Sequence, residues 1–264
     1  MTNPDIDNPL PEPPPETGQR IAYHRDIDEL SAGVLQLGAL ACETIPRGTE
    51  VLLGGNLGDA QELIDADDAI DDLSVQLEER CYQIIALQAP MAGDLRKIIT
   101  ISKVVAEIER SADLMVNICK ASRRMYGAEL TPRIRGVLQS MSKEANKLLR
   151  LSLDAFADEN VSLASALADI DDELDQLNRD IVEAIFEAHA IGQIDLGAAV
   201  QLALIARYFE RIGDHAVNIG ERVVYMVTGW MPEHNAVLRV KEKRALSDGA
   251  AAGPESAPDA GEDG

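Results

Sequence analysis

The stretch Arg207-Tyr-Phe-Glu-Arg-Ile-Gly-Asp-His-Ala-Val-Asn-Ile-Gly-Glu221 decides the fold that the sequence predicts. An α-helix turns about 100° per residue, so the acidic side chains of this stretch share one line with Asn218. The large apolar side chains fall on the opposite side, as expected for an amphipathic helix with one face in a core. The acidic line is Glu210, Asp214, Asn218 and Glu221, and the apolar side is Ile205, Phe209, Ile212, Ile219 and Val223.

The same pattern occurs earlier in the chain. Glu109–Ile118 matches Glu210–Ile219 at six of ten positions, 101 residues apart (210 − 109 = 101). Matches kept in the same order indicate an internal duplication of about a hundred residues. The further matches are Asp94-Leu95 with Asp195-Leu196 at offset 101, Asp71-Asp72 and Gln76-Leu77 with Asp171-Asp172 and Gln176-Leu177 at offset 100, and Gly33–Gln36 with Gly136–Gln139 at offset 103.

Hydrophobic spacing predicts six helices and no strand. We expect Pro46 and Gly48 to break or kink the first helix, Asp94 to cap the third, and Thr131-Pro132 to start the fourth. The prediction is an all-α fold of two tandem three-helix bundles, side by side. The expected helices start near 26, 59, 94, 131, 161 and 195, and the expected parts are a disordered Pro-rich arm (1–18), the first repeat (19–127), the second repeat (128–232) and an acidic, mostly disordered tail (233–264).

The chain is strongly acidic, with a formal net charge of −22. Such a surface repels nucleic acid and anionic lipid, and it favours cations or basic protein surfaces. Adaptation to salt, or solubility alone, explains the charge equally well. No apolar run reaches the length of a membrane span, so we expect no direct membrane insertion. The odd number of cysteines, without a secretion signal, predicts a reducing cytoplasm and buried thiols at Cys42, Cys81 and Cys119.

Several motifs together resemble the PhoU family over roughly residues 20–232. Glu210-Arg-Ile-Gly-Asp214 with Asn218-Ile219, and Glu109-Arg110 with Asp113, are similar to its two Glu-xxx-Asp signatures. Departures are Ser111-Ala112 in place of Ile-Gly, Lys120 where the second repeat has Glu221, and Asp195-Leu196-Gly197 in place of Asp-Leu-Arg. The supporting motifs are Tyr23-His24 before a helix and Gln88–Arg96 as a turn into the third helix.

The resemblance implies a cytoplasmic, all-helical, non-enzymatic protein. It implies negative regulation of high-affinity phosphate uptake and of the phosphate-starvation response. The implied partners are the ATPase of the phosphate ABC transporter and a phosphate-sensing histidine kinase, and we expect a homodimer. It also implies metal binding at the Glu-xxx-Asp lines.

Carboxylates one helical turn apart repel each other, yet they are suitable ligands for hard cations. We predict a divalent or ferric ion (Mg, Mn, Fe or Zn) at Glu210, Asp214 and Asn218, with a weaker copy at Glu109, Asp113 and Asn117, because Lys120 lowers the negative charge there. Neighbouring helices would add Asp71 and Asp171 as ligands. The further aspartates in these segments are Asp67, Asp68, Asp72, Asp172 and Asp175. The alternative interpretation is a solvated acidic face.

The other candidate residues give weaker indications of function. We expect His215 on the surface, His24 in a structural role, and Arg110 in a weak surface ion pair. The sequence shows no nucleophile with a base, no phosphate-binding glycine loop and no Glu-x-x-His motif, which favours a binding protein over an enzyme. A metal store or a carboxylate-bridged metalloenzyme, unrelated to phosphate, stays the alternative.

Overall fold

The computed structural model describes residues 18–230, and within that range every regular element is a helix. The all-α class and the tandem arrangement are therefore confirmed. The expectations for the Pro-rich arm, apart from Gly18, and for the whole acidic tail lie outside the described residues. The helices are α1 (Gly18–Gly54), α2 (Leu57–Ala66), α3 (Asp68–Gln88) and α4 (Ala92–Arg124) in the first repeat, and α5 (Pro132–Ala157), α6 (Val161–Ala190) and α7 (Leu196–Thr228) in the second.

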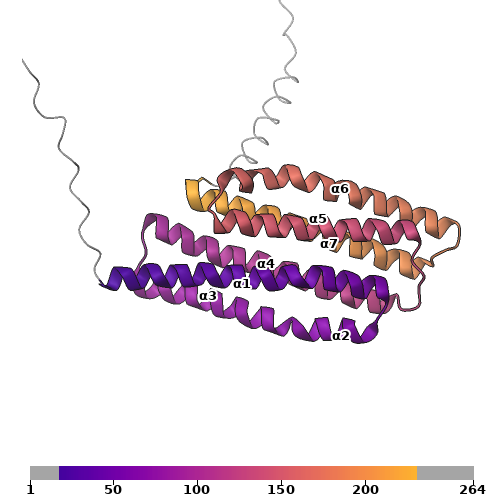
Figure 1. Ribbon diagram of the computed structural model, residues 1–264, viewed down its shortest axis with the longest axis horizontal. Helices are drawn as coiled ribbons and strands as arrows, with labels where there is room; N and C mark the ends of the chain where they lie inside the picture. Colours follow the sequence, from indigo (N-terminus) through magenta and orange to yellow (C-terminus); the bar gives the residue numbers. More distant parts are fainter. Residues whose placement is uncertain (1–17, 231–264) are drawn as a thin grey trace, which may run out of the picture.

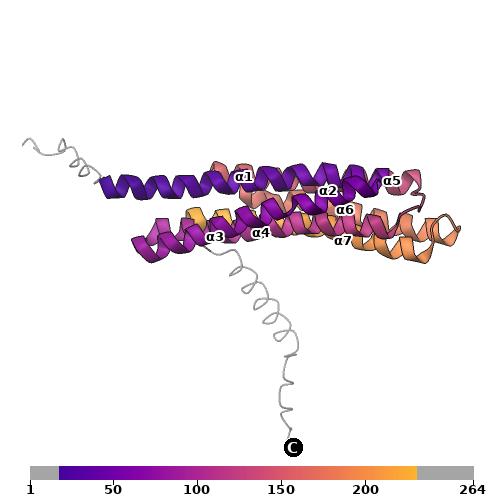
Figure 2. The same ribbon diagram turned by 90° about the horizontal axis from the view of Figure 1, so that it is seen from below.

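The two repeats lie side by side and share one core. Figure 1 shows α1–α4 in one half and α5–α7 in the other, with α6 at the outer edge, and Figure 2 shows the same rods from below. Helix α4 packs against α7, and α1 packs against α5. Ile108 of α4 and Phe209 of α7 are fully buried in the same apolar cluster. The bundles are thus joined by apolar packing and not only by the short segment between α4 and α5.

Side chains before several helices satisfy their first free N–H groups. The Thr131 hydroxyl accepts from Ile134 N at 3.3 Å, with Pro132 at the first helical position, as the sequence predicted. The Asp195 carboxylate accepts from Ala198 N at 2.7 Å. Asn56 and Asn160 cap α2 and α6 in the same way. These caps fix where the helices of each hairpin begin.

Three local expectations were wrong. Helix α1 continues through Pro46, where Thr49 Oγ1 lies 2.8 Å from Ile45 O and 2.7 Å from Ser142 Oγ of α5. Contact with α5 therefore holds the segment helical although proline cannot donate a backbone hydrogen bond. The expected second helix is divided at Asp67, which gives seven helices among the described residues. Helix α4 begins at Ala92, so Asp94 lies in its first turn and does not cap it.

Burial also corrects the alignment of the repeats. Helices α4 and α7 match at offset 101, since Ile98, Ile101 and Ile108 are buried like Ala199, Leu202 and Phe209. The outer helices match at offset 104, not at 100. The buried residues Ala60, Leu63, Ile70, Leu77, Cys81 and Ile84 correspond to Ala164, Leu167, Leu174, Ile181, Ile185 and Ala188.

The first helices also match at offset 104, since buried Leu30 and Val34 correspond to buried Ile134 and Leu138. The match of Gly33–Gln36 with Gly136–Gln139 at offset 103 is therefore accidental. The separation between equivalent buried positions of the last two helices is three residues shorter in the second repeat, since Ile84 and Ile98 are 14 positions apart and Ala188 and Ala199 are 11 apart (14 − 11 = 3). All three cysteines are buried free thiols, as expected.

Close packing of α6 against α7 predicts a stability difference between two glycines. A Cβ added at Gly220 would lie 2.7 Å from Ala164 O, a backbone atom, whereas a Cβ at Gly136 would meet no atom within 4 Å. Gly220→Ala should lower the free energy of unfolding by about 1–3 kcal/mol. Gly136→Ala should raise it by up to about 1 kcal/mol, because alanine is the better helix former. Urea unfolding measures both, and equal stability of the two variants would contradict this packing.

Candidate functional site: two acidic clusters

The first acidic cluster consists of Asp67, Asp71, Glu109 and Asp113. Asp67 and Asp71 come from the α2–α3 junction and α3, and Glu109 and Asp113 come from the facing side of α4. Burial and then the charges of its three partners raise the pKa of Asp67 to about 6, with Lys120 acting in the opposite direction. Burial, followed by the charge of Asp113, likewise raises the pKa values of Asp71 and Glu109. The cluster therefore holds negative charge that its surroundings compensate poorly.

The second acidic cluster consists of Asp171, Asp175, Glu210 and Asp214. Burial and then the charges of the other three members raise the pKa of Asp171 to about 6. Its Oδ1 is buried and accepts no hydrogen bond within the described part of the chain. The residue sits against Gly213, where an added Cβ would come within 2.4 Å of that oxygen. Glycine at 213 is what lets the carboxylate approach α7 so closely.

Arg207 forms ion pairs with two members of the second cluster, whereas Arg110 acts on the first cluster through its charge, which opposes the rise in the pKa of Glu109. Arg207 NH1 lies 2.6 Å from Glu210 Oε1, and its NH2 lies 3.8 Å from Asp214 Oδ2. Asn178 Nδ2 also donates to Glu210 Oε2 at 3.0 Å. The position equivalent to Arg207 in α4 holds Ala106 (207 − 101 = 106). Glu210 is therefore partly neutralised and hydrogen-bonded. The sequence analysis, which ranked this copy as the stronger metal site, did not take these contacts into account.

The structure shows which of the predicted carboxylates lie together, and it reveals a repeated pattern that the sequence analysis missed. Asp71, Glu109 and Asp113 share one electrostatic cluster, and Asp171, Glu210 and Asp214 share the other. Asp67 is the position equivalent to Asp171 at offset 104. The sequence analysis named Asp67 only as a further aspartate near the metal site. The repeated pattern Asp67-Asp68-x-Ile70-Asp71-x-Leu73 and Asp171-Asp172-x-Leu174-Asp175-x-Leu177 would have revealed the pairing.

A third group joins the two repeats at their interface. His215 Nδ1 lies 2.6 Å from Glu107 Oε2, and Asn218 Nδ2 donates to the same oxygen at 3.2 Å. Although burial by itself raises the pKa of Glu107, hydrogen bonds from His215 and Asn218 hold it below the usual value. His215 is only 7% exposed, so its expected surface position was wrong. One helix viewed alone could not show that α4 of the other repeat covers this side of α7.

The structure also shows the positions of the remaining predicted residues. The side-chain amide of Asn218 donates a hydrogen bond to Glu107. Asn117, at the equivalent position of α4, is half-buried. Arg110 is largely exposed and lies 3.5 Å from Glu107, in agreement with a weak ion pair. Among the described residues, no three His, Cys, Asp or Glu side chains lie close enough together to form a ready-made metal site.

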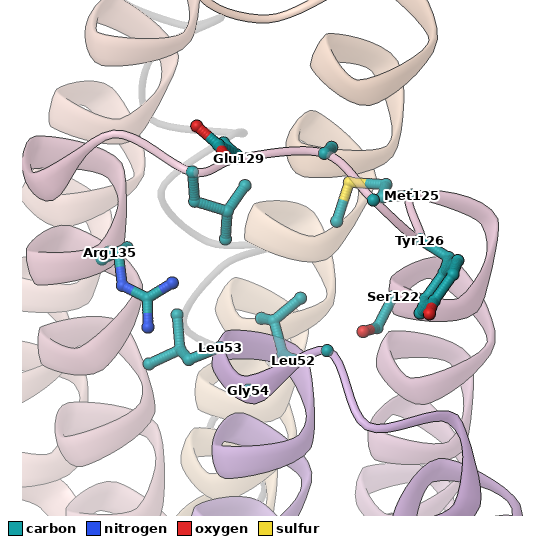
Figure 3. Close-up of a pocket in the computed structure, with 12 residues that line it drawn as sticks. Leu52, Leu53, Gly54, Ser122, Met125, Tyr126, Glu129 and Arg135 are labelled. Atoms are coloured by element: carbon teal, nitrogen blue, oxygen red, sulfur yellow. The ribbon is translucent and has the colours of Figure 1, made fainter.

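A surface hollow lies away from both acidic clusters, at the end of α1. Figure 3 shows Leu52 and Leu53 at the end of α1, with Arg135 of α5 on one side and Met125 and Tyr126 on the other. None of its lining residues belongs to an acidic cluster. In the range 18–230, no helix has the length and apolar character needed to cross a membrane.

Fold and site together define a class: a duplicated helical protein in which the outer and last helices of each repeat hold a carboxylate cluster. Residues 34–122 and 138–223 each match the family model described as PhoU domain. The chain is 32% identical to phosphate-specific transport system accessory protein PhoU homolog 1 of Mycobacterium tuberculosis, over 83% of this chain and 98% of that protein. It is 33% identical to PhoU homolog 1 of Thermotoga maritima, over 79% of this chain and 90% of that protein.

Solved structures agree. PhoU from Pseudomonas aeruginosa superposes with a TM-score of 0.73 at 27% identity, covering 79% of this chain and all of that one. The phosphate transport system regulatory protein PhoU from Streptococcus pneumoniae gives the same TM-score at 28% identity, covering 79% of this chain and 98% of that one. The chain belongs to the PhoU family.

The raised pKa of Asp67 predicts a pH-dependent stability. Because the folded protein binds this proton more tightly than the unfolded chain, the stabilisation is complete below about pH 4 and is lost as the pH rises through about 6. Asp67→Asn should therefore raise the free energy of unfolding at pH 7.5 by about 1–2 kcal/mol, after allowance for screening, and by little at pH 4. Urea unfolding at both pH values measures this. Asp169→Asn, at an exposed aspartate of α6, is the control, and an equal gain in that variant would contradict the assignment.

Proposed function

We propose that this chain is a non-catalytic, cytoplasmic negative regulator of phosphate uptake and of the phosphate-starvation response. It acts by contacting the ATPase of the phosphate transporter, a phosphate-sensing histidine kinase, or both. The observation that carries the proposal is the match over almost the full length of proteins named as phosphate transport accessory proteins. A duplicated, acidic helical surface suits binding to proteins with basic patches, because opposite charges speed their association.

We further propose that the acidic clusters take up a hard divalent or ferric cation. The donor chemistry fits, because each cluster combines carboxylates from two helices, and the charges of the neighbours raise the pKa values of Asp67 and Asp171. The unpartnered buried oxygen of Asp171 also fits a missing positive partner. Since the ligands are not gathered in the structure, binding has to draw them together. The bound ion would supply the positive charge that the clusters lack.

Cation binding should differ between the clusters. We expect Mn²⁺ to raise the thermal midpoint of the wild type, since a ligand at a hundred times its Kd stabilises the folded state by about 2.7 kcal/mol. Glu109→Gln/Asp113→Asn should remove most of this shift. Glu210→Gln/Asp214→Asn should remove less, because Arg207 already contacts both carboxylates. Calorimetry checks the binding directly, and identical shifts in all three proteins would exclude both clusters as metal sites.

Deletion of the gene tests the regulatory role. In high phosphate, we expect the deletion strain to show raised transporter expression and phosphate accumulation, because the negative regulator is gone. Both quantities should return to normal when the wild-type gene is restored. If uptake, polyphosphate and starvation-gene expression stay unchanged in the deletion strain, the proposed function is wrong.

Complementation by the two cluster variants separates regulation from cation binding. Rescue by wild type but not by Glu109→Gln/Asp113→Asn or Glu210→Gln/Asp214→Asn makes the clusters part of the mechanism. Equal rescue by all three proteins leaves the regulatory role intact and removes the clusters from it. Protein levels measured by immunoblot control for loss of folding.

A further inference from the structure

Three cations stand along the seam between α4 and α7. Lys103 and Arg110 belong to α4, and Arg211 belongs to α7. Lys103 and Arg211 are exposed, and the side chain of Arg110 is 56% exposed. Seven residues separate Lys103 from Arg110, so at about 100° per residue their side chains leave α4 in nearly the same direction. We call Lys103, Arg110 and Arg211 the cationic seam.

Two contacts fix the register of α4 against α7. His215 Nδ1 lies 2.6 Å from Glu107 Oε2, and Thr100 Oγ1 donates to the carbonyl oxygen of Arg222 at 3.5 Å. The residue numbers of both pairs add up to 322 (107 + 215 = 322, 100 + 222 = 322). The two helices are therefore antiparallel, and facing positions add up to about 322.

This register places the cations beside each other at the edge where the two helices meet. Arg110 and Arg211 add up to 321, so they stand level on opposite sides of the seam (110 + 211 = 321). Around α4, Lys103 lies about 40° from the contact residue Glu107. Around α7, Arg211 lies about 40° from the contact residue His215. The cationic seam therefore borders the inter-repeat contact on its solvent side.

No described helix lies over the cationic seam. Besides each other, α4 packs against α1, α2 and α3, and α7 packs against α5 and α6, so within residues 18–230 no third helix contacts both. Figure 2 shows α1 along one side of the molecule and α4 with α7 along the other. In the same range Lys103 and Arg211 form no ion pair, and Arg110 is paired only with Glu107. In a chain of net charge −22, this surface keeps a positive charge.

The same chain contains a segment of opposite charge. Residues 245–264 hold five acidic residues and no basic one, a net charge of −5 (0 − 5 = −5). This segment lies outside the described residues, and only its sequence enters the argument. Opposite charges on two parts of one chain attract each other, provided that the chain between them is long enough. The acidic residues are Asp248, Glu255, Asp259, Glu262 and Asp263.

The chain leaves α7 at one end of the cationic seam. Gly229 follows the last residue of α7, and a Cβ added there would lie 3.7 Å from the guanidinium of Arg96, in the first turns of α4. From Gly229 back to Arg211 is 18 residues of helix (229 − 211 = 18), or about 27 Å. The 25 residues from 230 to 254 can span up to about 80 Å (254 − 229 = 25). The acidic segment therefore reaches every part of the seam.

Tethering makes a weak attraction sufficient. Ion pairs between exposed side chains are individually weak. A segment joined to its site by a short flexible connection, however, has an effective concentration on the order of 1 mM. An intramolecular contact of this kind forms although the same segment, as a separate peptide, would need millimolar concentrations to bind.

We propose that the acidic segment 248–263 of this chain docks on the cationic seam. Its carboxylates pair with Lys103, Arg110 and Arg211, and the docked segment shields the seam from acidic segments of other proteins. Because the contact is made between exposed charges, it weakens as salt rises. The inference does not depend on the proposed function, because it concerns a contact within one chain.

Carbodiimide cross-linking of the full chain tests the docking directly. The reagent joins a lysine to a carboxylate that it touches, so Lys97 with Glu159, at 2.8 Å, is the positive control. We expect mass spectrometry to find Lys103 joined to a carboxylate of 248–263, with a yield that falls at least threefold in about 0.5 M salt. Lys143 is the matched control, because it is exposed and belongs to α5, which does not pack against α4. Its yield with the segment should be less than a fifth of that of Lys103.

Charge variants of the full chain, titrated with a labelled peptide of residues 248–264, give a second test. The tail variant should bind the peptide at least threefold more tightly than wild type, because its own segment no longer occupies the seam. A control variant with the same net charge, changed at exposed positions of α1, α2, α3 and α6, should bind like wild type. Adding Lys103→Gln/Arg211→Gln to the tail variant should abolish the gain. The tail variant is Glu255→Gln/Asp259→Asn/Glu262→Gln/Asp263→Asn, and the control is Asp28→Asn/Glu62→Gln/Glu79→Gln/Asp169→Asn.

Three results would overturn the inference. One is the absence of a cross-link between Lys103 and the segment, or equal yields at Lys103 and Lys143. Another is equal peptide binding by wild type and tail variant, with circular dichroism showing equal helix content. The third is a cross-link found only between two copies in a mixture of isotope-labelled and unlabelled chains, which would assign the segment to the seam of a second copy.

Discussion

The packing of α4 against α7 is the constraint on which the rest of the structure depends. Both helices are buried along most of their circumference, since α4 also packs on α1 and α3, and α7 also packs on α5 and α6. Each therefore keeps one solvent-facing side. That side carries Glu109 and Asp113 on α4, and Glu210 and Asp214 on α7, together with basic residues such as Arg110 and Arg211. The acidic clusters lie on this side because the core covers the rest of each helix.

This packing also explains how the clusters persist at an energetic cost. Burial and the charges of neighbouring carboxylates raise the pKa values of Asp67 and Asp171, so the ionised forms of these two residues destabilise the fold near neutral pH. The shared apolar core, with Phe209, Ile108 and Ile212 fully buried, supplies far more favourable free energy than this repulsion takes away. Binding of a positively charged ligand would relieve this repulsion, so the clusters favour such a ligand. The same argument applies to an ion and to a basic protein surface.

The sequence predicted the architecture because the duplicated signature is long and rich in amphipathic spacing. It placed Glu109 with Asp113, and Glu210 with Asp214, because both pairs lie within one helix. It failed where a contact joins helices that are distant in sequence. His215 was misplaced because the covering residue, Glu107, lies 108 positions away in the other repeat. The alignment of the outer helices slipped by four residues because Asp-rich segments match one another at several offsets. Burial, not identity, resolved the register.

Covalent linkage of the repeats explains their divergence. In a symmetric assembly of identical chains, every substitution appears at both equivalent positions. Here Glu107 and His215 form a contact whose counterpart positions hold Tyr208 and Leu114 (107 + 101 = 208, 215 − 101 = 114), so the pairing is made once. Once the two halves are distinguishable, their surfaces are free to differ. Ala106 leaves the first cluster without an arginine of its own helix at that position, while Arg207 partly neutralises the second. Glu78 and Lys103 are charged, whereas Val182 and Leu204 stand at the equivalent positions of the second repeat. The fold is thus shared between the repeats, while the side chains at equivalent surface positions differ in charge.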